Sequence, residues 1–288
     1  MRVLVTGCRG QLGRALAAAL PAAGHEFIGV DLPELDITDA ETVRLRVAAA
    51  RPEVIVNCAA FTAVDAAETA EAAALAVNGT AVETLADACE RVGSRLVQIS
   101  TDYVFDGTAT RAYRESDLPG PLSAYGRTKL AGERAAARAS RHLIVRTAWL
   151  FGQGANFVAA IRRQLDAGAR QLRVVSDQFG CPTYAADLAA ALVQLLVIEA
   201  HGTVHVVNEG STSWFGLARE IVRQTGALAE VVPISTAQAS RPAARPARSI
   251  LDTARLRELL GHGLPAWQDA LGRYLCGGGR CTDPAAAP

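Results

Sequence analysis

The sequence predicts an α/β protein with a doubly wound parallel sheet and a smaller C-terminal substrate-binding domain. Three observations lead to this prediction. Short apolar runs alternate with helical patterns of ten or more residues, a glycine-rich segment follows the first run, and an acidic residue ends the second. Uncharged strands of this kind suit a parallel sheet with helices on both faces. Right-handed crossovers then give a Rossmann sheet, which binds its ligands outside the carboxyl ends of the strands.

The first half of the chain repeats the strand–helix unit. Apolar runs predict strands over residues 3–5, 27–30, 54–56, 96–99 and 143–145. Alanine-rich or periodic segments between them predict helices over residues 11–20, 39–50, 71–92 and 124–138. We therefore expect residues 1–150 to form one Rossmann domain.

The alternation of predicted strands and helices becomes less regular after Leu150. We expect helices over residues 156–167, 187–199 and 214–225, and strands over 172–175 and 204–207. Three prolines between Pro233 and Pro246 predict a loop that closes over a ligand, and the tail from Cys276 is expected to fray. Residues 151–288 are thus expected to form the smaller domain, with elements near 184–208 returning to the first sheet.

The charge balance excludes several classes of partner. The chain has 288 residues, with 29 Lys and Arg against 29 Asp and Glu, so its formal net charge is zero. Nucleic-acid binders need a cationic excess, and aromatic residues at 5% are too few for a base-stacking surface. A small anionic substrate stays possible, because it needs only a few local donors.

The cysteines and the apolar runs favour a cytoplasmic location. The six cysteines form no C-x-x-C pair, and no signal-peptide pattern precedes Val3, so we expect reduced thiols. No uncharged apolar run approaches the ~20 residues that a bilayer requires. The five histidines have no metal-ligand spacing, so we expect no metal.

The segment Gly7-x-x-Gly10-x-x-Gly13 follows the first strand and opens a helix. Gly7 permits a tight turn, Gly10 lets a diphosphate approach the helix N-terminus, and Gly13 lets the helix pack close to the sheet. Asp31, at the end of the next strand, suits a ribose 2′-hydroxyl and repels a 2′-phosphate. A ligand-free turn is the alternative for the glycines, and a loop-capping role is the alternative for Asp31. The context favours a dinucleotide.

Tyr125 and Lys129 lie four residues apart at the start of a predicted helix, so their side chains share one helix face. A neighbouring ammonium lowers the pKa of a phenol, and such a tyrosine gives a proton to a carbonyl oxygen as that carbonyl is reduced. The spacing alone is also common on solvated helix faces. Here it follows Ser100 and Thr101 at a strand end, and we choose Thr101 as the hydroxyl that bonds the same carbonyl.

These residues resemble the extended short-chain dehydrogenase/reductases, and further motifs resemble the dTDP-4-dehydrorhamnose reductase family. The motifs comprise residues 57–65 (NCAAFTAVD), 100–107 (STDYVFDG), 146–149 (RTAW), 177–183 (DQFGCPT), 245–249 (RPARS), 251–253 (LDT) and 264–267 (LPAW). The resemblance covers nearly the whole chain. It implies reduction of the C4 ketone of dTDP-4-dehydro-L-rhamnose with NADPH or NADH.

The resemblance also implies a role for each matching residue. Tyr125 is the proton donor, Lys129 its electrostatic partner and a holder of the nicotinamide ribose, and Thr101 positions the ketone. The cofactor is held by Gly7, Gly10, Gln11, Leu12, Gly13, Asp31, Asp36, Ile37, Ala60, Phe61, Thr62 and Lys129. The sugar nucleotide is bound by Thr101, Asp102, Tyr103, Tyr125, Trp149, Arg245 and Arg248. Core packing is the alternative for Trp149 and Tyr103, and a surface role is the alternative for the two arginines.

Two departures from the family pattern bear on partners and cofactor. Some members bridge a dimer through magnesium with a glutamate two positions after the third glycine, where this chain has Ala15. We therefore expect a monomer or a weak homodimer. The family often accepts both NADPH and NADH, whereas Asp31 with no neighbouring arginine favours NADH, so the cofactor choice stays open.

Two other functions remain as alternatives. The first is a 4-ketoreductase that makes another dTDP-deoxysugar, or a branched sugar, for a secondary metabolite. The second is a non-catalytic, dinucleotide-binding regulatory subunit, like one described for methionine adenosyltransferase. The regulatory role does not require Thr101, Tyr125 and Lys129 together, and this chain has all three.

Overall fold

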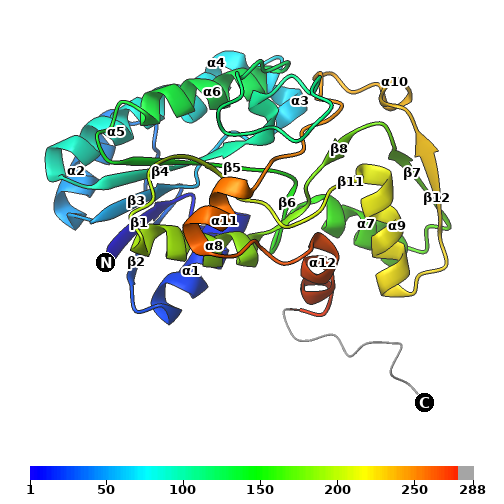
Figure 1. Cartoon of the computed structure of the whole chain (residues 1–288). Helices are drawn as coiled ribbons and strands as arrows, with labels where there is room; N and C mark the ends of the chain where they lie inside the picture. The colour runs from blue at the N-terminus through cyan, green and yellow to red at the C-terminus, as the bar shows by residue number, and fades with distance from the viewer. Residues whose placement is uncertain (278–288) are drawn as a thin grey trace.

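The centre of the molecule is a six-stranded parallel sheet with the strand order β10–β5–β4–β3–β1–β2 (Figure 1). We analysed a computed structural model that describes residues 1–277. The strands are β1 (Arg2–Thr6), β2 (Glu26–Val30), β3 (Val54–Asn57), β4 (Arg95–Thr101), β5 (His142–Thr147) and β10 (Gly202–His205). The chain places β2 on one side of β1 and β3 on the other. This reversal creates the crevice in which such sheets bind ligands.

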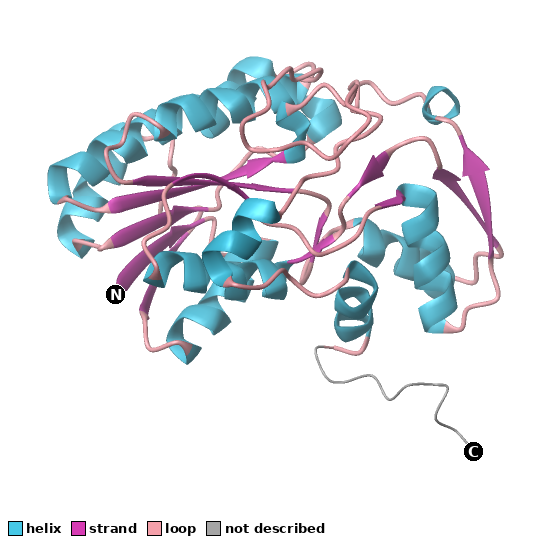
Figure 2. Cartoon of the chain, in the orientation of Figure 1, coloured by secondary structure: helices cyan, strands magenta, loops and turns pink. Residues whose placement is uncertain are grey.

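Helices cover both faces of this sheet, as predicted (Figure 2). On one face lie α2 (Ala40–Ala50), α5 (Ala81–Val92) and α6 (Ala124–Ala136); on the other lie α1 (Gln11–Ala22), α8 (Ala185–Val197) and α11 (Ala254–Leu260). Alternate residues of β1 enter the two cores. Val3 and Val5 pack with α1 and α8, whereas Leu4 packs with α2 and α5. The doubly wound fold class is confirmed.

The helix predicted over residues 71–92 is interrupted. It consists of α4 (Glu71–Leu75), a π-helical turn η1 (Ala76–Thr80) and α5. Within η1, the Asn78 side chain bonds both backbone groups of Phe61 and the hydroxyl of Thr128. π-Helical turns frequently occur at functional sites. Here the turn joins α6 to the segment that follows β3.

A smaller unit lies beside the sheet (Figure 1). It contains α7 (Phe157–Asp166), α9 (Trp214–Thr225), α12 (Trp267–Leu275) and the parallel strands β7 (Gln171–Val175) and β12 (Glu230–Ile234). Two short pairs connect it to the sheet: β6 (Leu150–Phe151) with β9 (Thr183–Tyr184), and β8 (Phe179–Gly180) with β11 (Thr212–Ser213). The short helices are α3 (Val64–Ala67), η2 (Asp102–Val104) and α10 (Thr236–Ala239).

The structure corrects the loop predicted between Pro233 and Pro246. Pro233 lies inside β12, and α10 follows at once. A proline is tolerated here because β12 belongs to a two-stranded pair and therefore has a free edge. Residues 241–249, which we call the strap, contain no helix or strand.

The cysteine prediction holds for four residues. Cys8, Cys58, Cys89 and Cys181 are free thiols, whereas Cys276 is disulfide-bonded, so the expectation of a reduced thiol is wrong there. Lack of a C-x-x-C spacing does not prevent a disulfide across a longer loop. The tail from Cys276 was expected to fray, and its residues beyond 277 lie outside the described residues. No described helix is both long and apolar enough to span a bilayer.

Candidate active site

A cleft of about 740 Å³ opens at the carboxyl ends of the central strands. It runs from the glycine segment to the ends of β4 and β5. Fifteen of the predicted residues line it: Gly7, Gly10, Gln11, Leu12, Gly13, Asp31, Asp36, Ile37, Ala60, Phe61, Thr62, Thr101, Tyr125, Lys129 and Trp149. The fold therefore brings the predicted cofactor residues and the predicted catalytic residues into one space.

The glycine segment has no room for side chains. Gly7 adopts φ +63°, and a Cβ there would lie 2.6 Å from the backbone nitrogen of Ala59. A Cβ on Gly13 would lie 2.4 Å from the carbonyl oxygen of Gly7. Gly10 is the N-cap of α1 and supplies no side-chain cap, so the first-turn N–H groups of α1 are available to a phosphate.

Asp31 has an arginine neighbour, contrary to the sequence analysis. The backbone N–H of Arg9 donates to Asp31 Oδ2 at 2.8 Å, and Arg9 Nη2 pairs with Glu34 Oε1 at 2.5 Å. Arg9 also donates to the carbonyl of Leu32. The glycine loop and the end of β2 are far apart in sequence, so only the fold brings the Arg9 backbone to Asp31 and the Arg9 guanidinium to Glu34. The site thus contains both a group that repels and a group that attracts a 2′-phosphate.

A dinucleotide fits this cleft on two observations. The crowded glycines leave a backbone cradle that a Cβ would fill. In addition, Gln11 Oε1 and Thr147 Oγ1 are buried at the cleft with no hydrogen-bond partner among the described residues. Buried polar groups are normally satisfied, so both oxygens are suited to contact a ligand.

Tyr125 and Thr101 line the same part of the cleft. Burial raises the pKa of Tyr125 to about 12, and the Thr101 side chain partly offsets this rise. From the sequence, we expected a lowered pKa. That expectation is wrong for the protein alone, because Lys129 Nζ donates to the carbonyl of Ile99 at 2.6 Å and does not offset the burial of the phenol. Burial also lowers the pKa of Lys129 to about 8.

The start of α6 explains how Tyr125 reaches Thr101. Ser123 caps the helix by accepting from the N–H of Gly126 at 3.2 Å. A Cβ on Gly126 would lie only 2.2 Å from the carbonyl oxygen of Tyr103. Glycine therefore lets α6 approach the end of β4 closely, and this approach brings Tyr125 to the part of the cleft that Thr101 lines.

Asp102 lies behind this pair and is not among the residues that line the cleft. Its carboxylate accepts hydrogen bonds from Thr101 Oγ1, at 3.1 Å, and from the hydroxyl of Ser249 on the strap. Burial raises the pKa of Asp102 to about 7. Asp102 therefore connects Thr101 to the strap.

A second cleft, of about 580 Å³, lies on the side of the smaller unit. Tyr103, Arg173, Gln178, Trp214, Arg241 and Arg245 are among the residues that line it. Arg245 makes two 3.0 Å bonds to Asp65, which holds the pKa of that carboxyl below its usual range. Arg248 lies over the ring of Phe179 and lines neither cleft. Of the two predicted arginines, only Arg245 thus faces a cleft.

Trp149 forms the boundary between the clefts. Its backbone adopts φ +45°, a sparsely populated conformation for a bulky residue. Its ring stacks on Trp214 at 3.5 Å, and a Cβ on Gly180 would lie 2.5 Å from it. Trp149 lines the first cleft and Trp214 the second, so the stacked pair is a shared wall.

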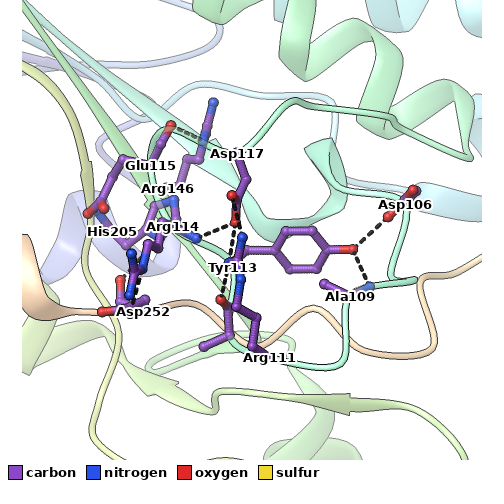
Figure 3. Close-up of polar contacts among 11 residues, drawn as sticks. Asp106, Ala109, Arg111, Tyr113, Arg114, Glu115, Asp117, Arg146, His205 and Asp252 are labelled. Carbon is purple, nitrogen blue, oxygen red and sulfur yellow. Dashed lines mark hydrogen bonds and ion pairs between the residues drawn. The ribbon is translucent and has the colours of Figure 1, made fainter.

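A buried polar network supports the ends of β4 and β5. Glu133 on α6 accepts from Ser100 and forms a bidentate ion pair with Arg146, both side chains being 5% exposed. Beyond Arg146, the His205 N–H donates to Glu115, and the His205 ring contacts the carbonyl of Asp252 (Figure 3). This network holds the C-terminal segment against the sheet.

Sequence reasoning missed Asn78, Asp65, Trp214 and Thr147. The motif that contains Asp65 was noted, but nothing local indicated its partner Arg245. Trp214 lay in a segment interpreted as a plain helix. The motif that contains Thr147 was noted, but no role was given to Thr147 itself. Asn78 gave no signal, because a π-helical turn has no distinct sequence pattern.

Comparisons with known proteins agree on one family. The family model "RmlD substrate binding domain" matches residues 1–277. A dTDP-4-dehydrorhamnose reductase of Streptomyces griseus is 45% identical, covering 100% of this chain and 97% of the relative. A dTDP-4-keto-6-deoxy-D-glucose reductase of Streptomyces niveus is 42% identical, covering 94% and 95%. The crystal structure of dTDP-4-dehydrorhamnose reductase from Bacillus anthracis in complex with NADP is 38% identical, with a TM-score of 0.93 over 96% and 99% of the two chains.

Proposed function

The chain belongs to the dTDP-4-dehydrorhamnose reductase family, and we propose that it reduces the C4 ketone of dTDP-4-dehydro-L-rhamnose to give dTDP-L-rhamnose. The observation that carries the proposal is the pair Thr101 and Tyr125, with Lys129, in a cleft that also holds the glycine cradle. A regulatory subunit would not need that pair. The protein is thus an NAD(P)H-dependent oxidoreductase that acts on a CH–OH group.

The cofactor side of the cleft would hold NADPH or NADH. The diphosphate meets the backbone of Gly10, Gln11 and Leu12 at the start of α1. Asp31 accepts from the ribose hydroxyl, and Asp36 and Ile37 border the adenine. When bound, the reduced nicotinamide supplies the two electrons and the hydrogen that are added to C4. The NADP-bound relative from Bacillus anthracis supports this assignment.

Tyr125 delivers the proton at the other atom of the carbonyl. Because burial raises the pKa of Tyr125 to about 12, its hydroxyl is protonated at neutral pH and enters the reaction as an acid. The proton moves from Tyr125 Oη to the C4 oxygen. Thr101 orients this hydroxyl, and Lys129 supplies the nearby positive charge that stabilises the phenolate left behind.

The sugar nucleotide would extend from Tyr125 into the second cleft. Trp149 packs on the deoxysugar, Tyr103 flanks it, and Arg245 faces the diphosphate. Asp102, which was predicted to flank the sugar, lines neither cleft and is bonded to Thr101 and Ser249, so we assign it no substrate contact. Asp65 pairs with Arg245 and also, at 3.4 Å, with Arg241, which leaves Arg173 as a further cation in that cleft. The substrate's two charges are thus met locally, in agreement with a net charge of zero for the chain.

The experiment is direct. Purified protein is mixed with dTDP-4-dehydro-L-rhamnose and NADPH or NADH, and loss of the reduced cofactor is followed at 340 nm. We expect turnover with wild type and a large loss with Tyr125→Phe. No turnover in wild type, or full activity in the variant, would refute the assignment.

The relative from Streptomyces niveus favours a second candidate, a 4-ketoreductase for another deoxysugar. Both functions use the same catalytic residues, so the configuration of the product at each sugar carbon separates them. NMR of the product formed from each keto sugar nucleotide, under competition, identifies the preferred reaction.

We also propose a cytoplasmic protein that is a monomer or a weak homodimer, with residues 1–150 as the cofactor domain and 151–288 as the sugar-nucleotide domain. The four free thiols support this location, whereas the disulfide at Cys276 does not. β10 and α8 come from the second half of the chain but pack with the first sheet. This supports the expectation that elements near residues 184–208 return to the cofactor domain. Cell fractionation and light scattering at several concentrations test the location and the oligomeric state.

A further inference from the structure

Thr147 is a buried residue of the first cleft that the proposed mechanism does not use. It ends β5, is 7% exposed, and lines the cleft beside Ala148 and Trp149. Its hydroxyl is one of the unpartnered buried groups described above. Such a group destabilises a folded protein unless something bonds to it.

The sheet places this hydroxyl next to the catalytic threonine. In the register of β4 and β5, Thr101 is opposite Thr147, and the preceding pair is Ser100 and Arg146. Ser100 and Arg146 both reach Glu133, on the α6 face. Because successive side chains of a strand alternate, Thr101 and Thr147 both point away from Glu133. The Thr101 hydroxyl bonds Asp102, whereas the Thr147 hydroxyl has no partner among residues 1–277.

We propose that Thr147 Oγ1 accepts a hydrogen bond from the carboxamide N–H of the bound nicotinamide and thereby fixes the orientation of the ring. This inference rests on the proposed function. The cleft is continuous from the glycine cradle, past Ala60 and Ile99, to Thr147. A dinucleotide whose diphosphate lies on α1 therefore brings its far end to β4 and β5. The carboxamide is the substituent of that ring that carries N–H donors, and a threonine hydroxyl accepts them.

The second cleft does not account for the hydroxyl. Thr147 is absent from its lining, and the sugar nucleotide would enter from Tyr103 and Trp214. In the proposed mechanism, the ketone oxygen already has Thr101 and Tyr125 as its partners. The amide of the cofactor is therefore the better partner for Thr147 than a hydroxyl of the sugar.

The test is Thr147→Val, which removes the hydroxyl and keeps the shape of the side chain. Binding of NADH and of reduced 3-acetylpyridine adenine dinucleotide, which has a methyl ketone in place of the amide, is measured by calorimetric titration. We expect the variant to bind NADH about fivefold to tenfold more weakly than wild type. Its affinity for the acetylpyridine analogue should equal that of wild type, because that ligand has no N–H donor to lose.

Two further variants serve as controls. Thr147→Ser keeps the hydroxyl and should bind NADH as wild type does. Thr183→Val removes a buried hydroxyl that is satisfied by the carbonyl of Cys181 at 3.1 Å, so it should lower the melting temperature and leave both affinities unchanged. Thr147→Val, in contrast, should melt at or above the temperature of wild type, because it removes an unpartnered group.

Each other outcome has a definite meaning. Equal losses for both dinucleotides would overturn the carboxamide assignment, as would unchanged NADH affinity combined with a raised KM for the sugar nucleotide. Failure of the wild-type protein to bind any nicotinamide dinucleotide would refute the proposed function itself. That result is distinguishable, because it does not depend on the variant.

Discussion

The two sides of the active site are built differently. The cofactor side consists of short segments that directly follow β1, β2 and β3, and its shape is set by backbone contacts at Gly7 and Gly13. The sugar side is assembled from distant segments and is tied by side chains. The Asp65–Arg245 ion pair spans 180 positions, and the Asp102–Ser249 bond spans 147. We therefore expect changes on the cofactor side to affect folding and cofactor binding together, and changes on the sugar side to affect substrate binding alone.

The largest effect is expected where the two sides meet. Tyr125→Phe should lower kcat by about 10²-fold to 10⁴-fold, because the proton donor is lost, and should leave both dissociation constants nearly unchanged. Single-turnover rates and direct titrations check this. Tyr113→Phe is the matched control, since that hydroxyl donates to Asp106 at 2.6 Å, outside both clefts. Equal losses of kcat in the two variants would contradict the assignment.

Acid should weaken the network that holds the C-terminal segment. Burial lowers the pKa of His205 to about 3, against 6.5 when unfolded, so the stability it contributes is complete above pH 6.5 and is lost as the pH falls toward 3. At pH 4 the linkage amounts to about 3 kcal/mol in the free energy of unfolding. Urea unfolding from pH 7 to pH 4 measures it. His205→Asn should flatten the dependence of the free energy of unfolding on pH, whereas His262→Asn, at an exposed residue, should not. Identical pH dependences in wild type and His205→Asn would exclude His205 as the cause.

Gly13→Ala tests the cofactor side. The new Cβ would meet the carbonyl oxygen of Gly7 at 2.4 Å, so α1 must shift. We expect a loss of about 1–3 kcal/mol in stability and at least about tenfold weaker cofactor binding, with sugar-nucleotide binding preserved. The control is Gly24→Ala, where φ is +76° but nothing lies within 4 Å. It should cost stability only, and a comparable loss of cofactor affinity there would weaken the packing argument.

Asp65→Asn tests the sugar side. It replaces an ion pair with a weaker hydrogen bond and loosens the strap, so KM for the sugar nucleotide should rise about tenfold while the cofactor dissociation constant stays the same. Glu71→Gln removes a comparable but exposed pair with Arg127 and should change neither constant. A change in cofactor affinity in Asp65→Asn would show that the two sides are not independent.

Arg9→Ala should give the smallest effect and bears on cofactor choice. Arg9 is the cation beside Asp31, so its loss should lower kcat/KM for NADPH about threefold to tenfold relative to NADH. Glu34→Gln frees Arg9 from its partner and should shift the ratio the other way. Parallel initial-rate measurements with both cofactors decide it, and shifts in the same direction would contradict this role for Arg9.

The same contrast explains what could be predicted from the sequence. The glycine segment and the Tyr125–Lys129 spacing are local patterns, and the structure places both at one cleft, as expected. Arg9 beside Asp31, Asp65 with Arg245, and Trp214 against Trp149 are contacts between distant segments, and no local pattern reports them. The direction of the Tyr125 pKa shift was missed for a related reason, because burial is a property of the packed molecule.

We propose that Tyr125, Thr101 and a nicotinamide cofactor together reduce C4 of a dTDP-4-keto-6-deoxyhexose in the first cleft. The most direct test uses cofactor deuterated at the transferable position of the nicotinamide, with NMR of the product. We expect wild type to form dTDP-L-rhamnose that carries one deuterium, at C4. The amount of this labelled product should be close to zero with Tyr125→Phe. A product that carries no deuterium at C4, or equal labelling in both proteins, would contradict it.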